Sequence, residues 1–95
     1  MNVKRTKKEQ VAQLRETLKM HDAYSRVFGG EDGALVLTDL ERRGFIHDLS
    51  YSPEPGRTEF NEGRRSLVMH VKYMMSSHAR DAVLTALQPE KTEGD

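Results

Sequence analysis

The chain contains no cysteine, only three prolines and few aromatic residues. Without cysteine it can form neither disulfide bonds nor thiolate metal sites, so its stability must come from packing and helix capping. Long hydrophobic runs are also missing, because no apolar stretch approaches the ~18 residues of a membrane span. The basic N-terminus is not followed by the apolar segment of a signal peptide. We therefore expect a soluble protein that has no membrane partner and is not exported through a signal peptide.

Length and charge indicate one small domain. Charged residues make up 32% of the 95 residues and hydrophobic residues 36%, which is enough for a single modest core. The 15 basic and 15 acidic side chains balance, so the formal net charge is zero. The first residues are nevertheless basic and the last ones acidic. We predict a basic N-terminal helix or arm at residues 1–22, a helical core domain at residues 23–88 and a disordered acidic tail at residues 89–95.

The first helix is predicted at residues 6–21, where Thr6 can act as its N-cap. Its apolar stripe is narrow and consists of Val11, Leu14 and Leu18 at the spacing i, i+3, i+7. A helix with so narrow a stripe would gain from packing on a partner or on a second copy. Residues 22–28 either continue this helix or begin a new one with Asp22 as N-cap.

Glycines separate the first helix from the second. Gly29 and Gly30 end the first helix, and Gly44 ends a second helix predicted at residues 32–43. The apolar residues that this second helix is expected to bury are Ala34, Val36, Leu37 and Leu40.

Residues 47–57 form a loop, because Pro53 and Pro55 remove two backbone donors and Gly56 permits a turn. In so small a domain a loop of this length is either a recognition element or a strap across the helices. The strap is the interpretation we favour.

The third helix, residues 58–75, dominates the pattern. Read at 100° per residue, its apolar side chains fall on one face, which we expect to be core: Phe60, Leu67, Val68, Val71, Met74 and Met75. Arg65 and Lys72 project almost opposite. A fourth helix follows at residues 78–87, with Ser77 as its cap. The predicted fold is therefore all-α, a small three- or four-helix bundle with a Pro/Gly-containing loop between helices two and three.

Arg64 lies near the middle of the predicted core face. A buried guanidinium left unpaired would cost several kcal/mol, so it must meet a carboxylate or backbone carbonyls. We predict a structural ion pair between Arg64 and Asp39, with Asp48 as the second choice of partner. The alternative is that Arg64 holds an anion or the carboxylate of a partner protein.

Two groups of side chains are candidates for contacts with other molecules. The possible nucleic-acid or anion contacts are the basic residues Lys4, Arg5, Lys7, Lys8, Arg65 and Lys72. This signal is weak, because acids are interspersed and no recognition helix is evident. The possible oligomer surface combines the narrow stripe of the first helix with two residues beside the core face of the third, namely Val11, Leu14, Leu18, Met69 and Tyr73.

No catalytic or metal-binding arrangement can be argued from the sequence. The spacing of His21, His47, His70 and His78 matches no metal-binding pattern. The glycines of GGEDG at residues 29–33 follow no strand and precede no lysine, so this segment is a turn between helices and not a phosphate loop. We expect no enzyme, no metal and no cofactor.

Three segments carry a resemblance to a known family: YSRVFGGEDGALVLTDL at residues 24–40, the Pro-containing loop, and FNEGRRSLVMHVKYMM at residues 60–75. Together they are similar to a family of small tailed-bacteriophage proteins. The matching residues are Tyr24, Phe28, Gly33, Val36, Leu37, Asp39, Leu40, Phe60, Glu62, Gly63, Arg65 and Ser66. The motif contains Asp39 together with Glu62, Gly63, Arg64 and Arg65. This combination is expected if the second and third helices cross closely at Gly63, with an ion pair beside the crossing.

The resemblance implies a role in virion assembly, because such genes commonly lie near DNA-packaging and portal genes. We therefore predict a non-enzymatic phage protein that acts through protein–protein contacts in virion assembly or DNA packaging. Its expected partners are a second copy of itself or a phage structural protein, with DNA as a possible contact of the basic arm. Its expected location is the host cytoplasm, with the virion as a second location. The alternatives are a small phage protein that inhibits a host protein, or a nucleotide-binding sponge that uses interface arginines.

Overall fold

The computed structural model describes residues 5–88. This part of the chain forms four helices and no strand: α1 (Lys7–Phe28), α2 (Glu31–Arg43), α3 (Arg57–Met75) and α4 (Ser77–Leu87). The predicted all-α class is confirmed. Lys4 of the basic arm and the acidic tail predicted at residues 89–95 lie outside the described residues.

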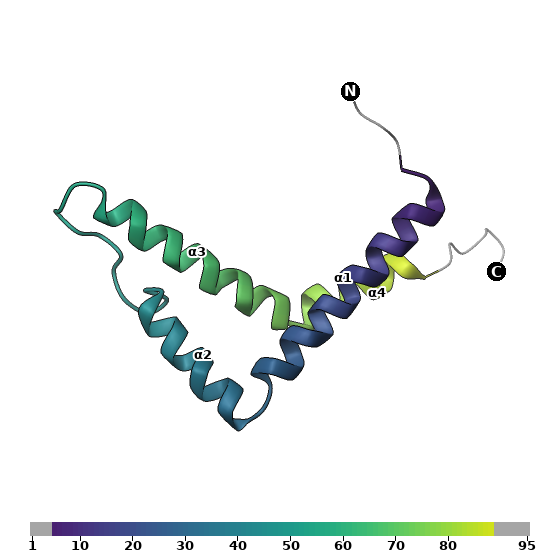
Figure 1. The fold of residues 1–95 in the computed structure, drawn as a ribbon, viewed down its shortest axis with the longest axis horizontal. Helices are drawn as coiled ribbons and strands as arrows, with labels where there is room; N and C mark the ends of the chain where they lie inside the picture. Colours follow the sequence, from purple (N-terminus) through teal and green to yellow (C-terminus); the bar gives the residue numbers. More distant parts are fainter. Residues whose placement is uncertain (1–4, 89–95) are drawn as a thin grey trace.

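The helices form two diverging arms (Figure 1). One arm consists of α2 and α3, which run in opposite directions. In the other arm, α4 runs antiparallel to the N-terminal part of α1. The C-terminal half of α1 crosses the end of α3, where the two arms meet. The Cα radius of gyration is 18.2 Å, against about 12 Å for a compact chain of this length. A single copy is therefore elongated and has little interior.

Side-chain caps define two of the helix starts. The Oγ1 atom of Thr6 accepts a hydrogen bond from the Glu9 backbone N–H at 3.1 Å, as predicted. α1 then continues without a break to Phe28, which decides between the two interpretations of residues 22–28. The cap of α4 is Ser76 and not Ser77, because the Ser76 Oγ atom accepts from the Ala79 N–H at 3.1 Å while its backbone is extended.

α2 ends in a Schellman motif in which Phe45 occupies the left-handed position usually taken by glycine. The Ile46 N–H donates to the Glu41 carbonyl at 3.0 Å, and the Phe45 φ angle is 55°. A non-glycine residue is strained in this region. The Phe45 carbonyl in turn accepts a hydrogen bond from the Arg65 guanidinium at 2.8 Å, which ties the turn to α3.

The core is small and is divided between the place where α1, α3 and α4 meet and the contact of α3 with Gly44 at the end of α2. Among the described residues, the buried hydrophobic side chains are Val68, Met74, Ala79 and Val83. His21 is also buried, and its Nδ1 atom is 2.9 Å from the Met74 carbonyl oxygen. Because this hydrogen bond joins α1 to the end of α3, it fixes the point where the two arms diverge.

Two flanks of α3 hold its neighbours. On the α2 flank, two side chains of α3 donate to backbone carbonyls: Asn61 to that of Ser50, and Arg65 to that of Phe45. On the same flank, Val68 lies against Gly44. Lys72 forms an ion pair with Glu41. On the α1 flank, Tyr73 and the Met74 carbonyl contact His21, and His70 contacts Tyr24 edge-on. These flanks are on opposite sides of the helix, so α3 is held from two sides.

The stripe of α3 between these flanks is not core, contrary to the prediction. Phe60 is 52% exposed and Leu67 66% exposed, although both were expected to be buried. Val36 of α2 was also expected to be buried and is 50% exposed, and Ala34 is exposed. The reason is that α1 and α2 pack on the flanks of α3 and leave the stripe uncovered within one chain.

The 44–56 segment is held against the N-terminal half of α3. The Ser52 N–H donates to the Thr58 Oγ1 atom at 2.9 Å, and the Asn61 Nδ2 atom donates to the Ser50 carbonyl at 2.9 Å. These hydrogen bonds join the segment to the first turns of α3. Gly56 supplies the left-handed residue, with φ of 76°, that turns the chain into α3.

The close approach predicted at Gly63 lies elsewhere. A Cβ atom at Gly63 would meet nothing within 4 Å, whereas one at Gly33 would lie 2.5 Å from the Phe28 Cα atom. α2 therefore crosses α1 at Gly33, and its other close contact is Gly44 against Val68 of α3.

Alanine substitutions at Gly33 and Gly63 should have opposite effects on the free energy of unfolding. Gly33→Ala forces the α1 and α2 backbones apart and should destabilise the protein by about 1–3 kcal/mol. Gly63→Ala has free space within a helix and should stabilise it by about 0.4–1 kcal/mol. Urea denaturation followed by circular dichroism measures both. Equal effects at the two positions would contradict the crossing at Gly33.

The ion pair between Lys72 and Glu41 should make stability depend on pH. The hydrogen bond from Lys72, 2.7 Å long, holds the pKa of Glu41 below its ordinary value of 4.5. Since the folded-state pKa is lowered, this contribution is complete above pH 4.5 and is lost as the pH falls through the folded-state pKa. Glu41→Gln should therefore lower the unfolding midpoint in urea at pH 7, with a much smaller difference at pH 3.

Glu16→Gln is the matched control, because the Glu16–Lys19 pair is exposed, spans 3.4 Å and lies within one helix. Its loss should change stability by less than about 1 kcal/mol at either pH. An equal loss for Glu41→Gln at pH 3 and pH 7 would show that the pair does not hold α2 on α3.

Candidate interaction surface

Three helices contribute to one uncovered apolar surface, which we term the apolar face. It consists of Met20, Tyr24 and Val27 of α1, Val36 and Leu40 of α2, and Phe60, Leu67 and Val71 of α3. The α3 stripe lies in the middle, because α1 and α2 hold α3 from either flank.

Two shallow grooves show that most of these residues adjoin one another. The first is lined by Met20, Ala23, Tyr24, Val27, Phe28 and Val71, and so joins α1 to α3. The second is lined by Leu40, Arg43, Gly44, Arg64, Leu67 and Val68, and so joins α2 to α3. Phe60 adjoins the second groove through Arg64, and Val36 lies one helical turn before Leu40. Leu67 and Val71 are four residues apart on α3 and neighbour each other on its surface. The apolar face is therefore continuous across the three helices.

Arg64 does not form the predicted ion pair with Asp39. Asp39 instead accepts from Arg42 at 2.7 Å and from Arg43 at 2.9 Å. These arginines lie three and four residues further along the same helix, so they reach the carboxylate without any tertiary contact. Hydrogen bonds from Arg43 and then Arg42 lower the pKa of Asp39.

The Arg64 guanidinium is exposed and stacks on an aromatic ring. Its Cζ atom is 4.9 Å from the centroid of the Phe60 ring, and the Cζ atom of Arg57 is 5.2 Å from the same centroid. Phe60 thus carries two guanidinium groups, each in a favourable cation–π position. Because Arg64 lies on an uncovered surface, water solvates it and no buried partner is required.

The basic candidates for nucleic-acid contact are not brought together. Arg65 and Lys72 are half-buried and engaged with Phe45 and Glu41 on the α2 flank, so neither projects freely outward. The remaining described candidates are exposed at the start of α1, on the other arm of the molecule (Figure 1): Arg5, Lys7 and Lys8.

The oligomer surface predicted from the sequence is also divided. Val11, Leu14 and Leu18 are half-buried on α1, which packs on α4 of the same chain. Met69 and Tyr73 are exposed, at 47% and 56%, but Met69 lies on the side of α3 opposite its apolar stripe and Tyr73 lies on the α1 flank.

The α1 part of the apolar face escaped the sequence analysis. Met20, Tyr24 and Val27 repeat at i, i+4, i+7, which is the spacing of an amphipathic stripe. The repeat becomes visible only when residues 22–28 are read as a continuation of α1.

Within residues 5–88, no group of three or more histidine, aspartate or glutamate side chains is placed to hold a metal ion. No helix in this same range is both long enough and apolar enough to span a membrane.

Asn61 has a buried Oδ1 atom without a hydrogen-bond partner, while its Nδ2 atom donates to the Ser50 carbonyl.

Comparisons with known proteins identify the family. No curated protein and no solved structure matches the chain. The family model described as Bbp19-like phage protein matches residues 24–88, which is more than half of the chain. This range contains α2, α3, α4 and the end of α1. The chain therefore belongs to the Bbp19-like phage protein family.

Proposed function

We propose that this phage protein acts without catalysis, through protein–protein contacts made by its apolar face, in the assembly of the virion. The observation that carries the proposal is the exposure of large hydrophobic side chains on one continuous surface. Leu67 and Val27 are 66% and 65% exposed, while the buried hydrophobic side chains of the described residues are as few as four. Contiguous apolar surfaces of this kind mark interaction sites in soluble proteins.

The hydrophobic free energy available from the exposed side chains favours a permanent partner. Complete burial of a Leu, Val, Phe or Met side chain is worth about 1.5–3 kcal/mol. A standard interface buries about 800 Å² per partner. Association through the apolar face would bury side chains that are at least half exposed in one copy, such as Val27, Phe60 and Leu67.

Virion assembly is the role that best fits both the family and the surface. The chain belongs to a phage family, and the resemblance of its motifs to small tailed-bacteriophage proteins implies a gene near the packaging and portal genes. Assembly proteins complete their cores through contacts between subunits, which accounts for a chain with little core of its own. The exposed basic residues Arg5, Lys7 and Lys8 would allow a further contact with DNA or an acidic protein surface.

Size-exclusion chromatography with light scattering tests the association. The wild-type protein should have a mass above 10.9 kDa at micromolar concentrations. Leu67→Asp should shift it to the monomer without loss of helicity, because it places a carboxylate on the apolar face. Leu49→Asp is the control, since Leu49 is 81% exposed in the loop and outside the face. A monomeric wild type, or equal effects of both substitutions, would contradict the proposal.

A phage carrying a stop codon in this gene tests the assembly role. Loss of infectious particles, with unassembled intermediates in the lysate and rescue by wild-type protein but not by Leu67→Asp, is expected. Normal particle yield with a defect in host takeover would point instead to an inhibitor of a host protein.

A further inference from the structure

Charged residues lie at the two ends of the apolar face. On α2, Asp32, Val36, Leu40 and Arg43 follow one another at i, i+4, i+8 and i+11, which places them along one side of the helix. Leu40 and Arg43 line the groove that also contains Arg64 and Leu67. The Asp32 carboxylate is therefore on the same side as the apolar face, at the end away from Arg43 and Arg64.

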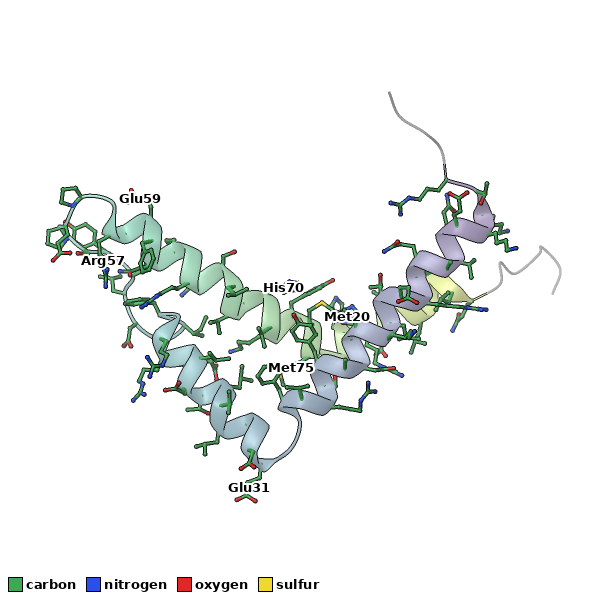
Figure 2. The ribbon with its side chains drawn as sticks, viewed as in Figure 1. Met20, Glu31, Arg57, Glu59, His70 and Met75 are labelled. Carbon is green, nitrogen blue, oxygen red and sulfur yellow. The ribbon has the colours of Figure 1, made fainter. Side chains whose placement is uncertain are left out.

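The two ends carry opposite charge and are well separated. Asp32 and Arg43 are eleven residues apart on α2, which corresponds to about 16 Å along the helix axis. Figure 2 shows Glu31 beside the turn between α1 and α2, and both Arg57 and Glu59 at the far end of α3.

Of these end charges, Arg43 pairs with Asp39 of its own helix, whereas Asp32 and Arg64 have no ionic partner within residues 5–88. Arg57 and Glu31 likewise belong to none of the ion pairs formed by these residues. In contrast, Asp39, Glu41 and Asp22 each pair with a cation.

From this arrangement we propose that the occupant of the apolar face is a second copy of the same face, related by a two-fold axis and antiparallel. The proposal rests on the self-association stated above and adds its geometry. A two-fold axis that lies in the plane of the face and perpendicular to α3 brings the surface of one copy onto the same surface of the other in the reverse direction. Asp32 of each copy then lies opposite Arg64 of its partner, with Arg43 beside it, and the apolar residues meet in between.

The charges select this arrangement over the others. A parallel pairing would place the Arg64 guanidinium groups of both copies together, and the Asp32 carboxylates likewise, so like charges would repel. Ion pairs at the rim of an interface contribute to orientation and specificity more than to affinity. A nucleic acid is disfavoured as the occupant, because its phosphates would meet the Asp32 carboxylate at one end of the face.

Cross-linking through engineered cysteines tests the geometry, because the chain contains no cysteine of its own. Asp32→Cys and Arg64→Cys proteins are mixed, allowed to exchange subunits and oxidised, and the linked peptides are identified by mass spectrometry. The proposal expects the 32–64 disulfide to form at least about tenfold faster than the 32–32 or 64–64 disulfide, since Cα atoms must approach to within about 7 Å. Asp81→Cys, at an exposed position of α4 outside the apolar face, is the control. When it is mixed with Arg64→Cys, it should not cross-link specifically.

Charge reversal gives a second measurement on the intact protein. Asp32→Arg and Arg64→Asp should each raise the dimer Kd about five- to tenfold, and the double variant should restore it, because both symmetry-related pairs re-form. The single variants must keep the helicity of the wild type.

The outcomes separate this proposal from the proposed function. A wild type that is monomeric by light scattering overturns both. An oligomeric wild type that yields mainly 32–32 and 64–64 links, or none at all, leaves self-association intact and overturns the antiparallel arrangement. Failure of the double variant to recover affinity overturns the pairing of Asp32 with Arg64.

Discussion

The structure depends on how α3 is held by its neighbours. Hydrogen bonds from Asn61, Arg65 and Lys72 fix α2 and the 44–56 segment to one flank, and the His21–Met74 hydrogen bond fixes α1 to the other. Polar contacts thus occupy the positions where a compact bundle would place hydrophobic ones. The stripe between the flanks, which contains Phe60 and Leu67, is left uncovered. The small core and the large apolar face are therefore two consequences of one packing arrangement.

Because the α3 stripe is uncovered, Arg57 and Arg64 are exposed and form no buried ion pair. Arg57 and Arg64 both contact the Phe60 ring and remain exposed to solvent. Each cation–π contact is worth about 0.5–1 kcal/mol at an exposed site, so it positions the guanidinium group without neutralising it. A partner carboxylate could then pair with an arginine that is already oriented beside an apolar surface.

The helices could be predicted from the sequence because their signals are local: Thr6 caps α1, Gly44 ends α2 and apolar spacing defines α3. The partners of each helix face could not, since an apolar stripe looks the same whether its own chain or another copy covers it. For this reason the sequence pattern predicts that Arg65 and Lys72 project outward and that α2 and α3 cross closely at Gly63, and neither prediction matches the structure. The pairing of Asp39 with Arg42 and Arg43, by contrast, obeys the local i, i+3 and i, i+4 rule and was predictable.

Hydroxyl-radical footprinting at increasing protein concentration tests the central claim most directly, because it reports the exposure of individual side chains in the intact protein. If the apolar face is the association surface, Phe60, Leu67 and Tyr24 become protected as the protein associates, while Leu49 and Tyr51 of the loop stay reactive. The account is contradicted if Phe60 and Leu67 remain as reactive as Leu49 in the associated protein, or if protection falls on Met69 and Tyr73 instead.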